Sequence, residues 1–286
     1  MEVVRASRYG GFCGGVKRAW ALAQQARAET AGPVYLTGEL IHNRPAMEEL
    51  YAQGLEIAHP SERELPPGSV LLVRAHGEGP QVYERAQQQG LKLIDASCGI
   101  VQRVQRKAAE WERQGYQVIL YGHRNHPESR ATIAYTRHGL IIESVAEAEA
   151  LPHFPRIAAL AQTTVLLSEY ERVCQVLATK CDEFMNQGQV CAWTRLAQDE
   201  AVAIARTVDA MVVVGGKHSS NTQQLAKVCG AIVPTYHIER LEELRPEWFA
   251  SARRVGLTAG ASTRDADIDA VAAWLAALEP APAGSA

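Results

Sequence analysis

The 286-residue sequence contains no apolar run of about 18 residues, so it predicts no membrane-spanning helix. Its first residues, Met1–Arg5, lack the apolar core of a secretory signal, and we expect a cytoplasmic protein. The net charge of −3 provides no broad basic field for nucleic acid or for an anionic membrane. A Walker A motif is missing, and no Gly-x-Gly-x-x-Gly follows a predicted strand. These absences leave the cysteines as the most informative residues.

Six cysteines lie far apart in a chain that otherwise has the composition of a cytosolic enzyme, which favours reduced thiols over disulfides. Cys13, Cys98 and Cys191 are spread almost evenly, in segments flanked by glycine or threonine. Three thiolates cannot complete a tetrahedral metal site or a four-iron cluster, which usually takes four protein ligands. They would leave one position open, where a substrate can bind.

Short apolar runs alternate with amphipathic helical stretches along the chain. The runs predict strands at 34–36, 70–73, 91–94, 118–120, 157–160, 211–214 and 255–257. Helices are predicted at 15–29, 101–114, 168–179, 198–208 and 265–278. This alternation is typical of parallel sheets covered by helices. The remaining cysteines, Cys174, Cys181 and Cys229, are expected to be core thiols. Cys174 and Cys181 are expected to share one face of a helix.

Hydrogen-bonding residues follow the predicted strands, and the carboxyl ends of parallel strands share one edge of a sheet. Three histidines lie at such ends, and a Ser-Ser-Asn run and a further serine precede helices: His42, His76, His126, Ser219, Ser220, Asn221 and Ser262. Helix N-termini and charge-assisted donors bind anions, so we predict a pocket for a compact polyanion such as a diphosphate. Glu128 is the one carboxylate close to this set, and a carboxyl group in a dry cleft is a natural proton donor.

Each of these residues also has an ordinary structural interpretation. A single histidine is more often structural than functional, and the Ser219–Asn221 run alone could be a helix N-cap. Glu128 could be a surface residue at a helix start, where the helix dipole favours a carboxylate. The convergence of three histidines, a hydroxyl cluster and three cysteines favours a functional site over a set of coincidences.

The motifs taken together resemble those of the hydroxymethylbutenyl diphosphate reductases, the LytB-type iron–sulfur enzymes of the non-mevalonate isoprenoid pathway. The resemblance runs from about Gly11 to Thr263. The matching segments, in chain order, are Gly11–Val16, Gly38–Asn43, Ala75–Gly77, Asp95–Cys98, Gly122–Glu128, Gln162–Thr164, Lys217–Asn221 and Thr258–Ser262.

This resemblance implies three similar α/β domains with parallel sheets around a pseudo-threefold axis, with a [4Fe–4S] cluster at the centre. We expect domains at 14–97, 98–190 and 191–279, with residues 1–13 packing near the centre and 280–286 as a flexible tail. Cys13, Cys98 and Cys191 would bind three irons, leaving the fourth to the substrate hydroxyl.

The resemblance also implies roles for the other residues. The diphosphate would be held by His42, His76, His126, Ser219, Ser220, Asn221 and Ser262, with Thr194 in the substrate site. Thr163 would hydrogen-bond the hydroxyl, and Glu128 would supply protons. Two electrons from a ferredoxin or flavodoxin would expel water from the allylic alcohol. Protonation of the resulting allyl species would give isopentenyl or dimethylallyl diphosphate.

Several positions depart from the family pattern. They are Gly99 and Arg264 in place of proline, Ser129 in place of an apolar residue, and Leu196–Ala197 in place of an Asn-Arg pair. These changes leave open a divergent paralogue with an altered rate, reductant or substrate. Three other functions also remain open: a quinolinate-synthase-like open-cluster enzyme acting on another small anion, a non-catalytic iron–sulfur protein, and a zinc protein using the same thiols.

Overall fold

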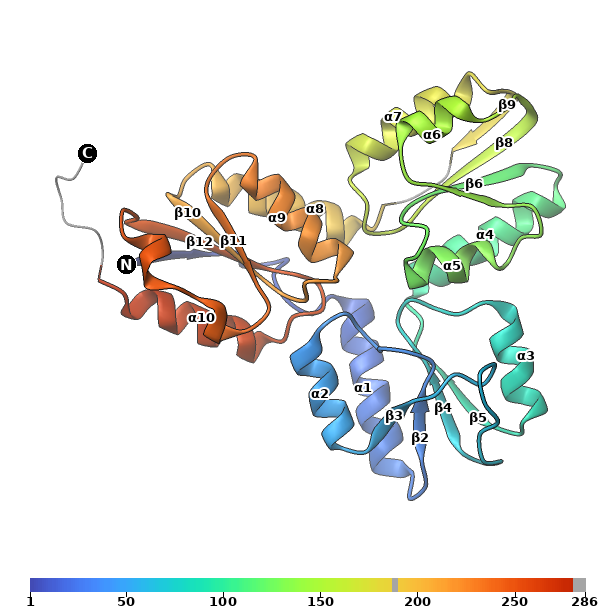
Figure 1. The fold of residues 1–286 in the computed structure, drawn as a ribbon, viewed down its shortest axis with the longest axis horizontal. Helices are drawn as coiled ribbons and strands as arrows, with labels where there is room; N and C mark the ends of the chain where they lie inside the picture. Colours follow the sequence, from blue (N-terminus) through green and yellow to red (C-terminus); the bar gives the residue numbers. More distant parts are fainter. Residues whose placement is uncertain (187–189, 280–286) are drawn as a thin grey trace. The chain divides into compact units, whose positions relative to one another are not determined.

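The computed structural model describes residues 1–186 and 190–279, and the expected tail at 280–286 lies outside this range. Three four-stranded sheets are formed, every strand pair is parallel, and helices pack against the sheets (Figure 1). The chain divides into two compact units. Unit 1 contains residues 1–16, 42–49 and the described residues from 192 onward, and unit 2 contains 17–41 and 50–191.

Unit 1 contains one sheet, with strand order β1-β12-β10-β11. Its strands are β1 (Glu2–Arg5), β10 (Ala210–Val214), β11 (Thr235–Ile238) and β12 (Arg254–Ala259). Its helices are α8 (Ala192–Ala205), α9 (Ser220–Gly230) and α10 (Asp265–Ala277), with short 3₁₀ helices at Leu241–Glu243 and Pro246–Phe249.

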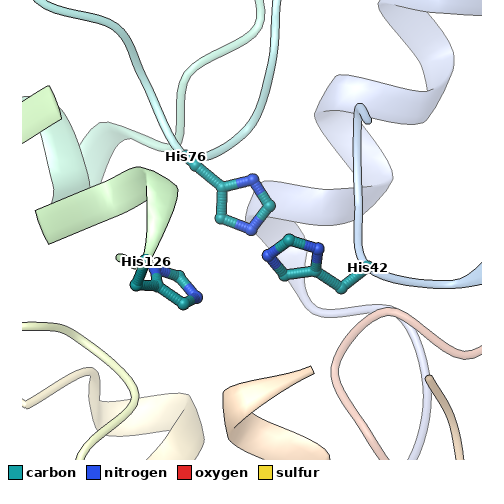
Figure 2. A group of neighbouring side chains, drawn as sticks. All are labelled: His42, His76 and His126. Carbon is teal, nitrogen blue, oxygen red and sulfur yellow. The ribbon is translucent and has the colours of Figure 1, made fainter. Parts of the chain in front are cut away.

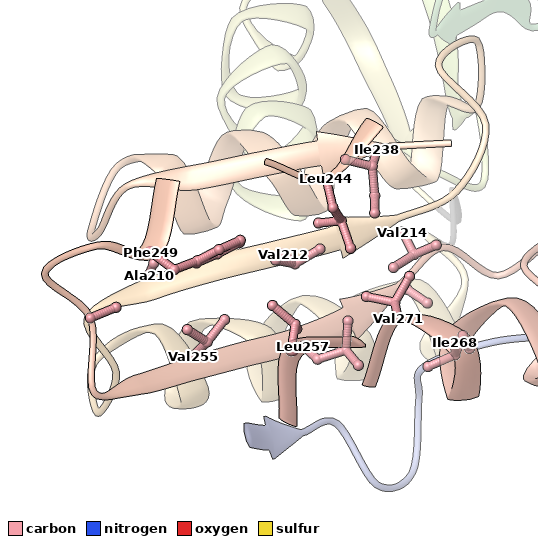
Figure 3. Packing of buried hydrophobic residues seen from close by; sticks show 13 residues of the cluster. Ala210, Val212, Val214, Ile238, Leu244, Phe249, Val255, Leu257, Ile268 and Val271 are labelled. Carbon is pink, nitrogen blue, oxygen red and sulfur yellow. The ribbon is translucent and has the colours of Figure 1, made fainter. Parts of the chain in front are cut away.

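The core of unit 1 follows the alternation of side chains along the central strand β10. Val212 and Val214 pack on one face, with Val271 of α10 and Phe249 in the same cluster (Figure 3). The intervening residues of β10 pack on the other face, against α8 and α9. Both faces of the sheet are therefore covered, as expected for a parallel sheet.

The first sheet of unit 2 has strand order β3-β2-β4-β5. Its strands are β2 (Val34–Leu36), β3 (Leu55–Ile57), β4 (Val70–Val73) and β5 (Lys92–Asp95). Helix α3 (Pro80–Gln88) lies between β4 and β5 in the chain. Helices α1 (Gly14–Glu29) and α2 (Arg44–Ala52) each contribute residues to both units.

The second sheet of unit 2 has strand order β7-β6-β8-β9. Its strands are β6 (Gln117–Tyr121), β7 (Leu140–Ile142), β8 (Phe154–Ala161) and β9 (Cys181–Asn186). The helices are α4 (Gly99–Arg113), α5 (Pro127–Ile133), α6 (Val145–Ala150) and α7 (Leu167–Ala178). Val118, Leu120 and their neighbours on β8 pack against α4, whereas Ile119 and Tyr121 pack against α7. Helices α4 and α7 therefore cover opposite faces of this sheet.

The predicted parallel α/β architecture with three similar sheets is confirmed, and all seven predicted strands are present. Cys174 and Cys229 are buried, as expected. The expectation for Cys181 is wrong, because α7 ends at Ala178 and Cys181 begins strand β9, where it is only half-buried. The boundaries at 97/98 and 190/191 stay predictions. No helix in the described part of the chain is long and apolar enough to cross a membrane.

Candidate active site

Each of the three cysteines singled out from the sequence lies directly before a helix. Cys13 precedes α1, Cys98 is the N-cap of α4, and Cys191 precedes α8. The free N–H groups and the dipole at a helix start stabilise a thiolate. All three are free cysteines and partly exposed. Each of the three thiols is therefore placed where the start of its helix stabilises a negative charge on the sulfur.

The backbone around the three cysteines repeats one arrangement. The N–H of Cys13 donates to the carbonyl of Ala261 at 3.1 Å, that of Cys98 to Ala75 at 2.9 Å, and that of Cys191 to Thr163 at 3.0 Å. Each acceptor lies two residues beyond the end of a strand, namely β12, β4 or β8. Each of these strands pairs with the one that precedes the cysteine, namely β1, β5 or β9. Three sheets thus present three cysteines in the same way.

The Cys98 thiol has both favourable and unfavourable neighbours for a negative charge. Burial raises the pKa of Cys98, and charges on Cys191 and Glu128 raise this pKa further. The backbone N–H groups of Ile100 and Val101 bond the sulfur and oppose the rise. A metal cation held by Cys98 and Cys191 together would remove the repulsion between the two thiolates.

The loop that carries Cys98 is held by Asp95, a residue of the Asp95–Cys98 motif to which the sequence analysis assigned no role. The Asp95 carboxylate accepts bonds from the Ser97 N–H at 2.9 Å, from Gln102 Nε2 at 3.0 Å and from the Tyr83 hydroxyl at 3.4 Å. The Arg18 guanidinium donates to the carbonyls of Asp95 and Ser97 at 3.0 and 3.1 Å. An Asp that bonds the N–H two residues later is an Asx-turn, so the Asp95-x-Ser97 spacing was the available signal.

Glu128 and Thr163 form a buried pair in unit 2, with 3% and 7% of their surfaces exposed. Glu128 Oε1 accepts the Thr163 N–H at 2.6 Å, and Oε2 accepts the Thr163 hydroxyl at 2.9 Å. Burial raises the pKa of Glu128 to about 7, against the lowering effect of both bonds. The carboxyl group can therefore both hold and release a proton near neutral pH.

Gln162, which is fully buried, holds the segments on either side of this pair. Its Oε1 accepts the N–H of His123 at 2.9 Å and the hydroxyl of Ser129 at 3.2 Å. Its Nε2 donates to the Thr164 hydroxyl at 2.7 Å. The departure at Ser129 therefore has a structural role, because the hydroxyl links α5 to the residues that follow β8.

His76 and His126 come from two different sheets of unit 2, and their rings meet edge to face with centroids 5.5 Å apart. His126 is the N-cap of α5, and its Nδ1 accepts the N–H of Glu128 at 3.2 Å. Gly77 has a positive φ of 74°, a conformation that favours glycine directly after His76. Figure 2 labels the two side chains, and it also labels His42, which belongs to unit 1 and is described with that unit.

Unit 1 contains the hydroxyl and amide residues of the predicted anion pocket. The Ser219 side chain caps α9 by accepting the N–H of Thr222 at 3.4 Å, and the Ser262 hydroxyl donates to the carbonyl of His42 at 3.0 Å. Asn221 is 4% exposed, and neither polar atom of its side chain has a hydrogen-bond partner. Thr194 is buried on α8. An unsatisfied buried amide is rare in native proteins and is consistent with a polar ligand.

Three other residues of unit 1 have structural roles. The Lys217 ammonium pairs with Glu243 at 2.8 Å, so its charge is already partly neutralised. Arg264 binds Asp267 and reaches Glu49 of α2 at 2.7 Å. Ala197 packs in the core between α8 and the sheet. This packing explains why alanine is accommodated at position 197, where the family pattern has a polar residue.

The fold and these residues define a parallel α/β protein with three thiols at helix starts, a buried carboxyl–hydroxyl pair and loops that carry hydroxyl and amide side chains. The chain belongs to the LytB family, whose profile, described as "LytB protein", matches residues 3–276. The resemblance found in the motifs is thereby confirmed.

Named relatives match over nearly the whole chain. A protein of Caldanaerobacter subterraneus subsp. tengcongensis is 38% identical and covers 95% of both chains, and one of Aquifex aeolicus is 38% identical and covers 93% of both. Both are named 4-hydroxy-3-methylbut-2-enyl diphosphate reductase.

Two solved structures also match. One is described as (E)-4-hydroxy-3-methyl-but-2-enyl diphosphate reductase, the terminal enzyme of the non-mevalonate pathway. It has a TM-score of 0.72 and 35% identity, and the match covers 96% of this chain and 99% of that one. The other, the E-1-hydroxy-2-methyl-but-2-enyl-4-diphosphate reductase of Plasmodium falciparum, has a TM-score of 0.89 and 26% identity. That match covers 96% of this chain and 87% of the other.

Proposed function

We propose that this chain is an oxidoreductase that converts 4-hydroxy-3-methylbut-2-enyl diphosphate to isopentenyl and dimethylallyl diphosphate. The observation that carries the proposal is the buried Glu128–Thr163 pair, which shares unit 2 with Cys98 and Cys191 in a chain of the LytB family. A reductive dehydroxylation needs a proton donor beside a redox centre, and this arrangement supplies both the donor and the thiols.

Cys13, Cys98 and Cys191 are proposed as the protein ligands of a [4Fe–4S] cluster. The thiols fit this group, because soft thiolates are the usual ligands of iron–sulfur clusters and backbone N–H groups stabilise them. Cys13 Sγ accepts the N–H of Val16 at 3.4 Å, and Cys98 is bonded by two N–H groups. When bound, the cluster would relay the two electrons of the reduction one at a time from the external donor, and it would offer one coordination position free of protein.

The diphosphate is proposed to bind to the polar residues that follow the strands. These are His42, His76, His126, Thr194, Ser219, Ser220, Asn221 and Ser262. The unpartnered Asn221 amide supports this assignment most directly, since a phosphate oxygen would accept its Nδ2–H. Each charge-assisted bond to a phosphate oxygen contributes about 1.5–3 kcal/mol.

Glu128 is proposed to supply the protons. At neutral pH a carboxyl group with a pKa of about 7 is protonated in a large fraction of molecules. It can donate to the departing hydroxyl, leaving a carboxylate that the Thr163 N–H and hydroxyl stabilise. In this proposal Thr163 both orients the carboxyl group and hydrogen-bonds the substrate hydroxyl.

Electrons are proposed to come from a separate ferredoxin- or flavodoxin-type protein, because the sequence contains no dinucleotide-binding motif. The test of the proposed function is anaerobic reconstitution with iron and sulfide, followed by turnover of the diphosphate with reduced methyl viologen. We expect a brown protein and both isoprenoid diphosphates as products. A colourless metal-loaded protein would indicate zinc, and a brown protein without turnover would favour another open-cluster activity.

A further inference from the structure

Helix α4 connects the Cys98 thiol to an exposed basic surface. Its apolar side chains face the second sheet of unit 2, with Val104, Ala108 and Trp111 buried in that core. The opposite side of the helix carries Arg103 and Arg106, both exposed. These two residues are three positions apart and therefore lie on the same side of the helix.

In the described part of the chain, Arg103 and Arg106 form no hydrogen bond or ion pair. A third exposed arginine, Arg18, donates to the carbonyls of Asp95 and Ser97 in the Cys98 loop. Arg18, Arg103 and Arg106 together are termed the α4 basic surface. It is a local feature, because the whole chain has a net charge of −3.

The opposing charges near this surface are Glu84, Asp95 and Glu110, the last of which lies one helical turn beyond Arg106 on α4. A hollow of about 490 Å³ is lined by Arg106, Glu84 and Asp95 together with neutral residues. The Asp95 carboxylate keeps its negative charge, because its three hydrogen-bond donors are neutral groups. Glu84 forms no ion pair within residues 1–186 and 190–279. Helix α4 itself carries four basic residues against two acidic ones, Glu110 and Glu112, so the surface keeps an excess of positive charge beside the Cys98 loop.

The α4 basic surface lies close to Cys98. Arg103 and Arg106 are five and eight residues beyond Cys98, which corresponds to about 7.5 and 12 Å along the helix axis. Electron transfer between proteins slows steeply with distance, so a donor must dock close to the redox centre. Complementary charge accelerates such encounters and orients the partners.

From these observations we infer that the α4 basic surface is the docking site for a small acidic one-electron carrier protein. The inference rests on the proposed function, because it assumes that Cys98 binds the group that receives the electrons. Arg103 and Arg106 contact the carrier and take no part in binding substrate or cluster. Salt weakens the association, because exposed charges are screened within about 10 Å at 0.1 M ionic strength.

The experiment measures binding and turnover separately on the cluster-loaded protein. Binding of an oxidised acidic plant-type [2Fe–2S] ferredoxin is measured by calorimetry at low and high salt. The double variant Arg103→Glu and Arg106→Glu should weaken binding at low salt roughly tenfold or more. Turnover with reduced methyl viologen, which needs no docking site, should stay at the level of the unmodified protein.

Two single variants form a matched pair. Arg106→Glu reverses one charge on the α4 basic surface, and the control Arg172→Glu reverses one charge elsewhere. Arg172 is exposed on α7, which covers the opposite face of the same sheet from α4. Arg106→Glu should weaken ferredoxin binding, whereas Arg172→Glu should not. Unchanged ferredoxin binding by the double variant, or equal effects of the two single variants, would overturn the inference. Failure of the unmodified protein to turn over with methyl viologen would instead reject the proposed function, and the binding comparison would still decide the docking site.

Discussion

The Glu128 carboxylate accepts both polar hydrogens of Thr163, the backbone N–H at 2.6 Å and the hydroxyl at 2.9 Å. Such bonds stabilise the ionised form, yet the pKa of Glu128 is raised to about 7 because burial outweighs them. The pair therefore balances a carboxyl group between its two protonation states near neutral pH. This balance is what a group that donates a proton in each turnover requires.

Replacing Glu128 with glutamine removes the transferable proton and keeps the size of the side chain. We expect turnover to fall by roughly 10²–10⁴-fold, with cluster content and substrate binding nearly unchanged. In the unmodified protein, turnover should decline as pH rises above about 7, because the acid form of Glu128 is lost. Single-turnover rates from pH 6 to 9 test this. The exposed Glu171→Gln is the control, and a fast, cluster-replete Glu128→Gln would mean that another group supplies the proton.

Thr163 adjusts the pKa of Glu128 through its hydroxyl. That hydrogen bond lowers the Glu128 pKa, so Thr163→Val should raise it above the present value of about 7. The acid form then persists to higher pH, and the alkaline decline in turnover should move to higher pH. Thr163→Ser retains the hydroxyl and should keep the original profile. Superimposable pH profiles for the valine and serine variants would contradict this role, whatever their absolute rates.

Local sequence patterns predict the central strands, because those strands are nearly continuous apolar runs. Val70–Val73 and Ala210–Val214 are buried at every position and match the predicted strands closely. Edge strands lack this signal. Strand β9 is Cys181–Asn186, partly exposed and polar, and the sequence reasoning included its first residue in the preceding helix. Strand β1 is defined by pairing with β12, about 250 residues away in the chain, which no local pattern reveals.

The candidate site likewise contains residues that the local sequence predicts and contacts that it does not. The cysteines, histidines and Ser-Ser-Asn run are recognisable because residue type and spacing alone suggest their chemistry. The support for them is long-range and was not foreseen. Gln162 joins segments that lie about 40 residues apart, and the Ser262 hydroxyl bonds the carbonyl of His42, 220 residues away. Such contacts depend on the assembled fold, and a single sequence contains no signal for them.

Serine variants of single cysteines distinguish the proposed cluster ligands from thiols that do not bind iron. Serine at Cys98 should abolish most of the iron and the visible absorbance after reconstitution, because a hydroxyl is a poor ligand for cluster iron. Cys181→Ser is the matched control, since Cys181 and Cys98 are both half-buried free thiols. Iron content and absorbance are measured on the same samples. Equal loss of iron in the two variants would show that the ligand assignment is wrong.

Asn221 and Ser219 are neighbours in the predicted diphosphate site and should respond differently to alanine. The Asn221 amide is buried without a partner, so Asn221→Ala should weaken binding of isopentenyl diphosphate by about tenfold to a hundredfold and leave stability intact. Ser219 caps α9, so Ser219→Ala should also cost about 1 kcal/mol of folding free energy.

Calorimetric titration with isopentenyl diphosphate and thermal unfolding of the same samples distinguish the two effects. We expect a lower melting temperature only for Ser219→Ala, and weaker binding for both variants. Normal diphosphate affinity in Asn221→Ala would show that the buried amide serves another purpose. A large drop in its melting temperature would show that the side chain has structural partners in solution, because an amide without partners contributes no hydrogen bonds whose loss could destabilise the fold.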